Sequence, residues 1–325
     1  MSNVITLAVR YHAIILFLLL RHDFPQCRGH ELTLRGGNFD PHDNHYHSHS
    51  FHNHRSLGEE HVNEDGIPIC GFPDPPEGNL QILGASHDSA LLRKIAKFLK
   101  RLWHADRHHD KNRIIVPTFY HIIQSDTVAG PSAARVQEQH DHLVEAFAPY
   151  GFSFILKNVT FTRNNEWFGY KGYNTIQERR MKTALRKGGP ESLNIYVNNG
   201  NGVCGYAYLP RFYASFPWND GIVINFRCFA GHTPSQEGDV VVHETGHWLG
   251  LLHTYSGCSE PGDGISDTPL QDGPTLGCPS APKNSCGKGN DLVDNFMDLS
   301  SDVCRSSFTP GQTKRMVEEW VRYRS

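Results

Sequence analysis

The stretch HETGHWLGLLH, residues 243–253, decides the fold that this chain is expected to have. Residues four apart lie on the same face of an α-helix, so His243 and His247 present two imidazole rings on one side. Glu244 lies beside them, where its carboxylate can reach a water molecule at the same centre without being a ligand. The spacing predicts a helix that offers two nitrogen ligands to one metal ion.

A third histidine tests this interpretation. If the helix continued, His253 would lie six residues beyond His247, about 240° round the axis and about 9 Å further along it, too far to share the ion. Gly250 lies between them, and glycine readily adopts the left-handed conformation that ends a helix and reverses the chain. We therefore expect the helix to end at Gly250 and the turn to return His253 to the ion.

Three neutral imidazoles and a water molecule make a catalytic zinc site with one open position. Zinc lowers the pKa of such a water to about 7, and Glu244 can take its proton and later pass it to a leaving amine. The alternative is a pair of helical histidines and an acid on a solvated surface. The added glycine and third histidine at fixed spacing favour the zinc site.

The composition excludes two classes of protein. The 325 residues include 31 basic and 34 acidic side chains, so the formal net charge of −3 offers no basic field for nucleic acid. No run of about 18 apolar residues is present to span a bilayer. The unusual count is 21 histidines, of which 14 precede Arg113.

The cysteine pattern indicates an oxidising compartment. Six of the eight cysteines lie between residues 204 and 304, and no CxxC pair is present. Disulfides therefore explain them better than a zinc ribbon or a thioredoxin-type site. One glycosylation sequon, Asn158-Val159-Thr160, agrees with secretion.

The N-terminal region is expected to be a leader. Residues 1–20 contain the apolar stretch Ala13–Leu20, which has the length of a signal-peptide core, and the alternatives are a buried strand or a wrongly chosen start codon. Residues 21–112 are rich in histidine between His42 and His54, which indicates a disordered leader or a loose metal-binding tract. Asp88–Trp103 has the pattern of a basic amphipathic helix that docks on its own domain, with a membrane surface or a partner helix as the alternatives.

A folded domain is predicted over residues 113–325. Strands and helices alternate at its start, which indicates an α/β (α+β) class of fold. The last helix begins with Thr309-Pro310-Gly311-Gln312, a capping box with proline in the first turn. Strands are expected at 114–123, 152–159, 193–197 and 221–226, and helices at 136–148 and 178–187.

The pattern HExxHxxGxxH is the signature of metzincin metallopeptidases, which also carry a methionine turn beneath the metal, here Asn295-Phe296-Met297-Asp298. More narrowly, the chain resembles the pappalysin family, and within it the secreted fungal and bacterial members. The resemblance extends over about residues 113–325. It is carried by HETGHWLGLLHTY (243–255), GDGISDTP (262–269), GCP (277–279) and NFMDLSSDVCRSSFTPGQTKR (295–315).

The resemblance implies a two-lobed metzincin fold. A twisted mixed sheet and the zinc helix would form the upper lobe, and a loop-rich, disulfide-tied segment the lower one. The edge strand that aligns a peptide substrate should lie near Val203–Leu209. In such relatives the later cysteines pair alternately, which implies Cys258–Cys286 and Cys278–Cys304, and Cys204–Cys228 follows by elimination.

The resemblance also implies a structural calcium site. Its ligands would be oxygens of Asp263, Ile265, Asp267 and Thr268, and the alternative is a solvated turn. One position departs from the family, because relatives often carry a tyrosine two residues after the turn methionine, where this chain has Leu299. A lost oxyanion donor can cost about 10²–10³ in rate, so catalytic efficiency is in question.

The leader contains a candidate for a segment that keeps the enzyme latent. Pro68-Ile69-Cys70-Gly71-Phe72-Pro73-Asp74 resembles the cysteine-switch motif of matrix metalloproteinase propeptides, with Ile69 in place of the arginine. The thiolate of Cys70 could occupy the open zinc position and keep the enzyme latent. The alternatives are a disulfide to Cys27 or a structural turn.

Together these features predict a secreted, extracellular zinc endopeptidase made as a precursor, with protein or peptide substrates and no nucleic-acid partner. The alternative is a non-enzymatic metal-binding or interaction protein with a weakened protease fold. The intact Glu244 favours the enzyme, because zinc binding alone does not need that carboxylate.

Overall fold

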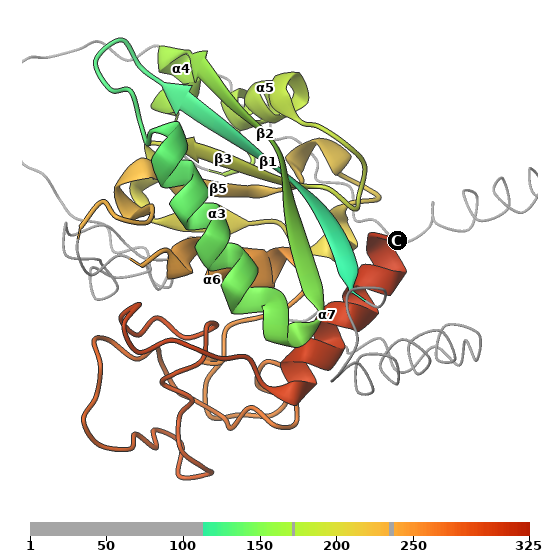
Figure 1. Ribbon diagram of the computed structural model, residues 1–325. Helices are drawn as coiled ribbons and strands as arrows, with labels where there is room; N and C mark the ends of the chain where they lie inside the picture. The colour runs from blue at the N-terminus through green and yellow to red at the C-terminus, as the bar shows by residue number, and fades with distance from the viewer. Residues whose placement is uncertain (1–112, 171–172, 234–236) are drawn as a thin grey trace, which may run out of the picture. The chain divides into compact units, whose positions relative to one another are not determined.

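The computed structural model describes residues 113–170, 173–233 and 237–325. Its centre is a five-stranded sheet in the order β2-β1-β3-β5-β4 (Figure 1). Neighbours among the first four strands are parallel, whereas β4 runs antiparallel to β5 at the edge. The strands are β1 Ile114–Gln124, β2 Phe152–Arg163, β3 Leu193–Asn198, β4 Gly205–Ala207 and β5 Ile222–Asn225.

Helices cover both faces of this sheet. The main apolar core joins one face to α3 (Ala133–Phe147) and α6 (Asp239–Trp248). A second cluster joins the other face to α4 (Asn165–Phe168) and α5 (Ile176–Leu185). Strand β3 is buried along its whole length because both of its faces are covered, as is usual in parallel sheets.

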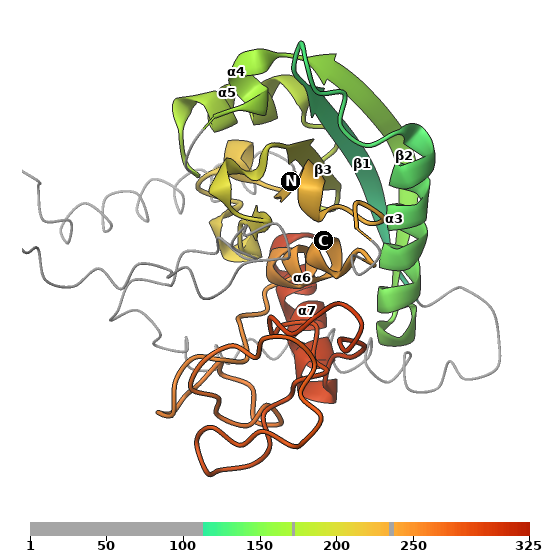
Figure 2. The same cartoon turned by 90° about the vertical axis from the view of Figure 1, so that its left-hand side faces the viewer.

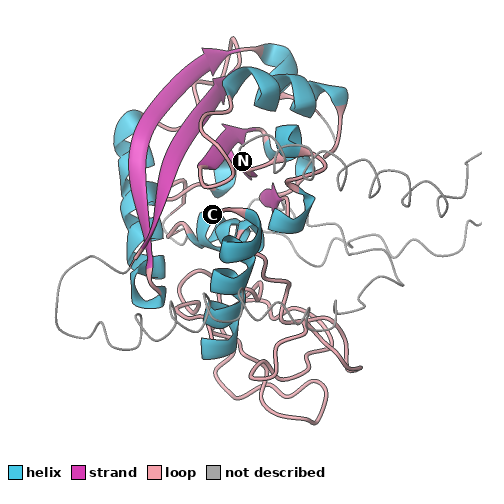
Figure 3. Ribbon diagram, turned by 90° about the vertical axis from the view of Figure 1, so that its right-hand side faces the viewer, coloured by secondary structure: helices cyan, strands magenta, loops and turns pink. Residues whose placement is uncertain are grey.

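The segment between α6 and α7 (Pro310–Tyr323) consists of loops and turns. Figures 1 and 2 show it on the side of α6 that faces away from the sheet, and Figure 3 shows it entirely as loop. Two disulfides, Cys258–Cys286 and Cys278–Cys304, cross-link this segment. Helix α7 begins with the predicted capping box, in which Thr309 and Gln312 each accept a hydrogen bond from the other's backbone N–H.

The fold class predicted from the sequence is confirmed, and every expected strand and helix after residue 113 is present within a few residues of its predicted range. Sequence reasoning missed the four-residue helix α4 and the 3₁₀ turns at 148–150, 200–202, 210–212, 217–219 and 226–228. The predicted leader, histidine tract, amphipathic helix, Cys27 and Cys70 lie outside the described residues. Among the described residues, no helix has the length and apolar character needed to cross a bilayer.

Candidate metal centre

Helix α6 carries the predicted zinc motif and is buried from end to end. Its N-terminus is held by a side chain from the loop segment, because Asp302 Oδ2 accepts hydrogen bonds from the backbone N–H groups of Glu237, Gly238 and Asp239. A carboxylate at this end satisfies orphan N–H groups and complements the helix dipole. Its other oxygen pairs with Arg305, which also contacts Asp239. Sequence reasoning did not identify this arrangement.

The helix ends as the sequence predicts. Gly250 has a φ of +100°, a conformation that L side chains rarely adopt. A Cβ atom at this position would lie 2.5 Å from Cγ of Glu319 in α7. The close approach of α7 therefore also requires a residue without a side chain at position 250. Beyond the turn, the carbonyl oxygen of Leu251 lies 2.8 Å from Nδ1 of His247 and fixes that ring.

The turn brings the three predicted histidines together. The Nε2 atom of His247 lies 3.1 Å from the Nε2 atoms of both His243 and His253. The Nδ1 atoms of His243 and His247 lie 2.7 and 2.8 Å from the carbonyl oxygens of Phe296 and Leu251. A neutral imidazole has one N–H, so donation from Nδ1 to a carbonyl leaves the Nε2 lone pair directed at the common centre.

This donor set fits a zinc ion. Tetrahedral coordination at 2.0–2.1 Å would place ligand nitrogens about 3.3 Å apart, close to the observed separations. Burial lowers the pKa of His247 to about 4. Burial, together with the repulsion that protonated His247 and His253 would exert, holds the pKa of His243 well below its usual value. Both rings are therefore neutral near pH 7, which is the form that binds metal.

Glu244 is fully buried beside the histidines and faces the edge strand β4. A Cβ atom built on Gly205 of that strand would lie 2.8 Å from Cγ and 2.9 Å from Oε1 of Glu244. The carboxylate and the edge strand are thus in direct contact. Sequence reasoning placed Glu244 at the centre and a strand near Val203–Leu209, but it did not single out Gly205.

The predicted methionine turn lies directly beneath the helix. A Cβ atom on Gly246 would lie 2.5 Å from the sulfur of Met297, so the glycine leaves room for the methionine side chain. The backbone N–H of Thr254 donates to the carbonyl oxygen of Met297 over 3.3 Å. Around the three histidine rings, the methionine turn therefore contacts both α6 and the segment that follows Gly250.

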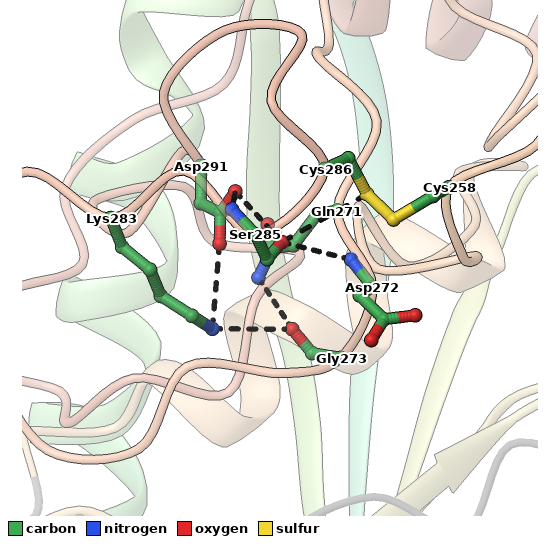
Figure 4. Close-up of a disulfide and its surroundings, with 8 residues drawn as sticks. All are labelled: Cys258, Gln271, Asp272, Gly273, Lys283, Ser285, Cys286 and Asp291. Carbon is green, nitrogen blue, oxygen red and sulfur yellow. Dashed lines mark hydrogen bonds and ion pairs between the residues drawn. A yellow bond between two sulfur atoms is a disulfide. The ribbon is translucent and has the colours of Figure 1, made fainter.

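The disulfide-tied loop is hydrogen-bonded to the methionine turn. Within this loop, the Cys258–Cys286 bond lies beside a cluster in which Lys283 pairs with Asp291 at 3.4 Å and Ser285 accepts a hydrogen bond from the backbone N–H of Asp272 (Figure 4). The side chain of Gln271 donates to Asp298 over 3.1 Å. This hydrogen bond links the loop to the residue that follows Met297.

The predicted calcium ligands are only partly assembled. Oδ1 of Asp263 lies 2.6 Å from Oγ1 of Thr268, which lies 2.7 Å from the carbonyl oxygen of Ile265. Asp267 is instead turned toward the start of α7, where its carboxylate accepts hydrogen bonds from Thr309 and from the backbone N–H of Gly311. Burial raises the pKa of Asp263 to about 6.

The predicted disulfides and Leu299 can also be placed in the structure. The structure contains all three expected disulfides, including Cys204–Cys228, which ties the residue before β4 to the 3₁₀ turn after β5. Leu299 is buried in a small apolar cluster with Leu209. Tyr255 packs against this cluster and stacks on the ring of His253 at a centroid distance of 4.5 Å, a contact that sequence reasoning missed.

Comparison with known proteins agrees with this geometry. The family model for pregnancy-associated plasma protein-A peptidases (Peptidase_M43) matches residues 191–320. An extracellular metalloprotease of Colletotrichum graminicola is 34% identical over 79% of this chain and 91% of its own length. An extracellular metalloprotease of Pyricularia oryzae is 35% identical over 79% and 89%, respectively.

A solved structure of another protein has a fold similar to that of this chain. Mature mirolysin of Tannerella forsythia, determined in complex with a cleaved peptide, is 28% identical, with a TM-score of 0.54 over 64% of this chain and 91% of that one. The family predicted from the zinc motif and the methionine turn is thereby confirmed. The chain belongs to the pappalysin family of metzincin-type zinc metallopeptidases.

Proposed function

We propose that this metallopeptidase is a secreted zinc endopeptidase in which His243, His247 and His253 hold the ion and Glu244 is the general base and acid. The observation that carries the proposal is the convergence of three Nε2 atoms next to a fully buried carboxylate. Metal binding alone would not need that carboxylate, so the arrangement favours an enzyme over a metal-binding protein.

The residues divide the chemistry of peptide hydrolysis among them. A zinc ion held by the three histidines supplies a Lewis acid that polarises the scissile carbonyl and acidifies water. Glu244 accepts the proton of the attacking water and delivers it to the leaving amine nitrogen. Its burial keeps the carboxylate away from bulk solvent.

The edge strand β4 is the proposed substrate platform. Among the described residues it pairs only with β5, so its outer edge is available there for a peptide added as a further antiparallel strand. Such pairing uses main-chain hydrogen bonds and therefore suits many sequences. Mirolysin crystallised with a cleaved peptide, which supports peptide substrates for this fold.

The test is casein cleavage by the full chain, secreted from a eukaryotic host. We expect cleavage that a chelator abolishes and added zinc restores. Glu244→Ala should bind one zinc per chain yet lose at least about 10²-fold in rate, in line with the contribution of general acid–base groups. Zinc binding without chelator-sensitive cleavage, both by the wild type and by a chain that carries Cys70→Ala, would favour the non-enzymatic alternative.

We also propose that the protein is made as a precursor, with a leader over residues 1–112, a catalytic domain over 113–325, and latency imposed by Cys70. Cys70 lies outside the described residues, so this proposal rests on the sequence motif alone. Cys70→Ala should raise the activity of the full chain, while Cys27→Ala should not. Equal activation by both changes would favour a Cys27–Cys70 disulfide instead.

A structural calcium ion is proposed at Asp263, with oxygens of Ile265 and Thr268 beside it. Asp267 would have to leave Thr309 and Gly311 to become the fourth predicted ligand. The single hydroxyl proton of Thr268 can serve only one of its two close oxygen neighbours, so a cation or a proton on Asp263 is needed to relieve the other contact. Oδ2 of Asp263 is buried and lacks a hydrogen-bond partner among the described residues. Calcium should raise Tm in the wild type and not in Asp263→Asn, with the exposed Asp272→Asn as control.

A further inference from the structure

We propose that Gly205 is a positioning residue for Glu244: the absence of a side chain on the edge strand sets where the carboxylate lies. This inference rests on the proposed role of Glu244 as general base. It concerns a residue 39 positions away in the sequence, on the strand proposed to align the substrate.

The nearest neighbours of such a side chain belong to Glu244. The three atoms nearest to a Cβ built on Gly205 are Cγ, Oε1 and Cδ of Glu244, at 2.8, 2.9 and 3.1 Å. Real Cβ atoms essentially never approach a heavy atom this closely, so either the strand or the carboxylate must shift. Gly205 does not have a positive φ, so an alanine there would strain this contact and not the backbone.

The strand is held in place by pairing with β5 and by a disulfide. Gly205 and Ala207 pair with Ile224 and Ile222 of β5, and the neighbouring Cys204 is bonded to Cys228. The carbonyl oxygen of Cys204 also accepts a hydrogen bond from the backbone N–H of Asn225 over 2.8 Å. A methyl group on residue 205 would therefore press on the Glu244 side chain, whose carboxylate lies at the end of rotatable bonds and would shift.

The direction of the Gly205 Cα–Cβ vector separates this role from substrate binding. Successive side chains of a strand point to opposite faces of the sheet, and Tyr206 packs in the cluster on the other face from α6. A methyl group on residue 205 therefore points toward Glu244 and not along the outer edge of β4, where a peptide would pair. Its expected effect is on kcat, with KM little changed.

The experiment is a double-mutant cycle in the full chain, with Gly205→Ala, Glu244→Ala and both changes together. Gly205→Ala should lower Tm by about 3–8 °C in the wild type and by under about 1 °C in Glu244→Ala, where the obstructing side chain is gone. It should also lower kcat on casein or a fluorogenic peptide by about 10- to 100-fold at unchanged zinc content. Gly169→Ala, at an ordinary contact beside α4, is the matched control.

The outcomes distinguish this inference from the proposed function. Equal Tm losses in the two backgrounds, or a wild-type kcat for Gly205→Ala, would overturn the positioning role. Full activity of Glu244→Ala would instead overturn the proposed general base, while the Tm cycle would still decide whether Gly205 and Glu244 are in contact. A Gly205→Ala protein that binds substrate poorly but turns it over normally would also contradict the inference.

Discussion

Arg324 closes the C-terminal end of the zinc helix by binding Trp248. Its Nε donates a hydrogen bond to the carbonyl oxygen of Trp248 over 3.0 Å, and its guanidinium lies 3.5 Å from the centroid of the indole ring. The indole N–H and the guanidinium both donate to the same oxygen of Asp220, each over 3.1 Å. The residue after His247 is thus held by the end of α7 and by the loop before β5.

Replacing Arg324 should therefore destabilise the catalytic domain. Arg324→Ala leaves Asp220 buried without its ion-pair partner, which costs about 3–5 kcal/mol of unfolding free energy. Arg324→Lys keeps the positive charge but lacks the planar guanidinium group, so it should retain only part of the unfolding free energy that Arg324→Ala loses. Denaturant unfolding measures both, and the exposed Arg322→Ala is the control. A loss no larger than that of Arg322→Ala would contradict the prediction.

Gly250→Ala should move His253 away from His243 and His247. Alanine is strained by about 1–2 kcal/mol at a left-handed position, and its Cβ would also collide with Glu319. We expect weaker zinc binding, measured by competition with a metallochromic chelator. Adding Glu319→Ala removes most of the side chain that residue 250 would collide with, so the double variant should regain part of the zinc affinity lost in Gly250→Ala. If it regains none, backbone strain alone is responsible for the loss.

Metal removal should lower thermal stability as well as activity. An ion bound only by the folded chain adds about 4 kcal/mol at a concentration 1,000-fold above its Kd. Differential scanning calorimetry with a zinc chelator, followed by zinc addition, measures this contribution. His253→Ala should show a smaller response than the wild type. A chelator-insensitive Tm in the wild type would argue against the three-histidine site.

Loss of Asp302 should loosen the start of the zinc helix. Asp302→Ala removes the acceptor for three backbone N–H groups and a partner of the buried Arg305, for an expected cost of about 2–4 kcal/mol. The exposed Asp294→Ala, elsewhere in the same loop segment, should cost far less. Chemical denaturation compares them, and hydrogen exchange should show faster opening at residues 239–242. Equal stabilities would contradict the capping role.

His121 should make the protein less stable in acid. Burial lowers the pKa of His121 to about 4, below its ordinary 6.5, while its ring nitrogens contact Thr160 and Asn194. Between pH 6.5 and 4 the unfolded chain takes up a proton that the folded chain refuses, so stability falls as pH falls through this window. The shift corresponds to about 3 kcal/mol.

The variant His121→Gln isolates this contribution. Its stability should depend less steeply on pH between 6.5 and 4, because the other buried histidines titrate in both proteins and cancel in the difference. Denaturant unfolding at several pH values supplies the measurement. Parallel stability–pH curves for the two proteins would show that His121 does not carry the effect.

The sequence by itself determined the convergence of the three histidines, because their arrangement is local. His243, His247, Gly250 and His253 lie within eleven residues, where helical periodicity and the conformational freedom of glycine are enough to predict which rings meet. The capping box at Thr309 is local in the same sense. The calcium loop shows the limit of this reasoning, since the predicted ligand Asp267 is directed at Thr309 and Gly311, a segment more than 40 residues away.

The tertiary structure alone decided what holds these histidines and Glu244 in place. Gly205 makes room for Glu244, Asp302 caps α6, and Arg324 closes its far end, although none of the three lies in the zinc motif. Hydrogen-bond periodicity within one helix is encoded by neighbouring residues. Contacts between distant segments depend instead on how the sheet, the loop segment and α7 pack around α6, and no spacing in the sequence specifies that packing.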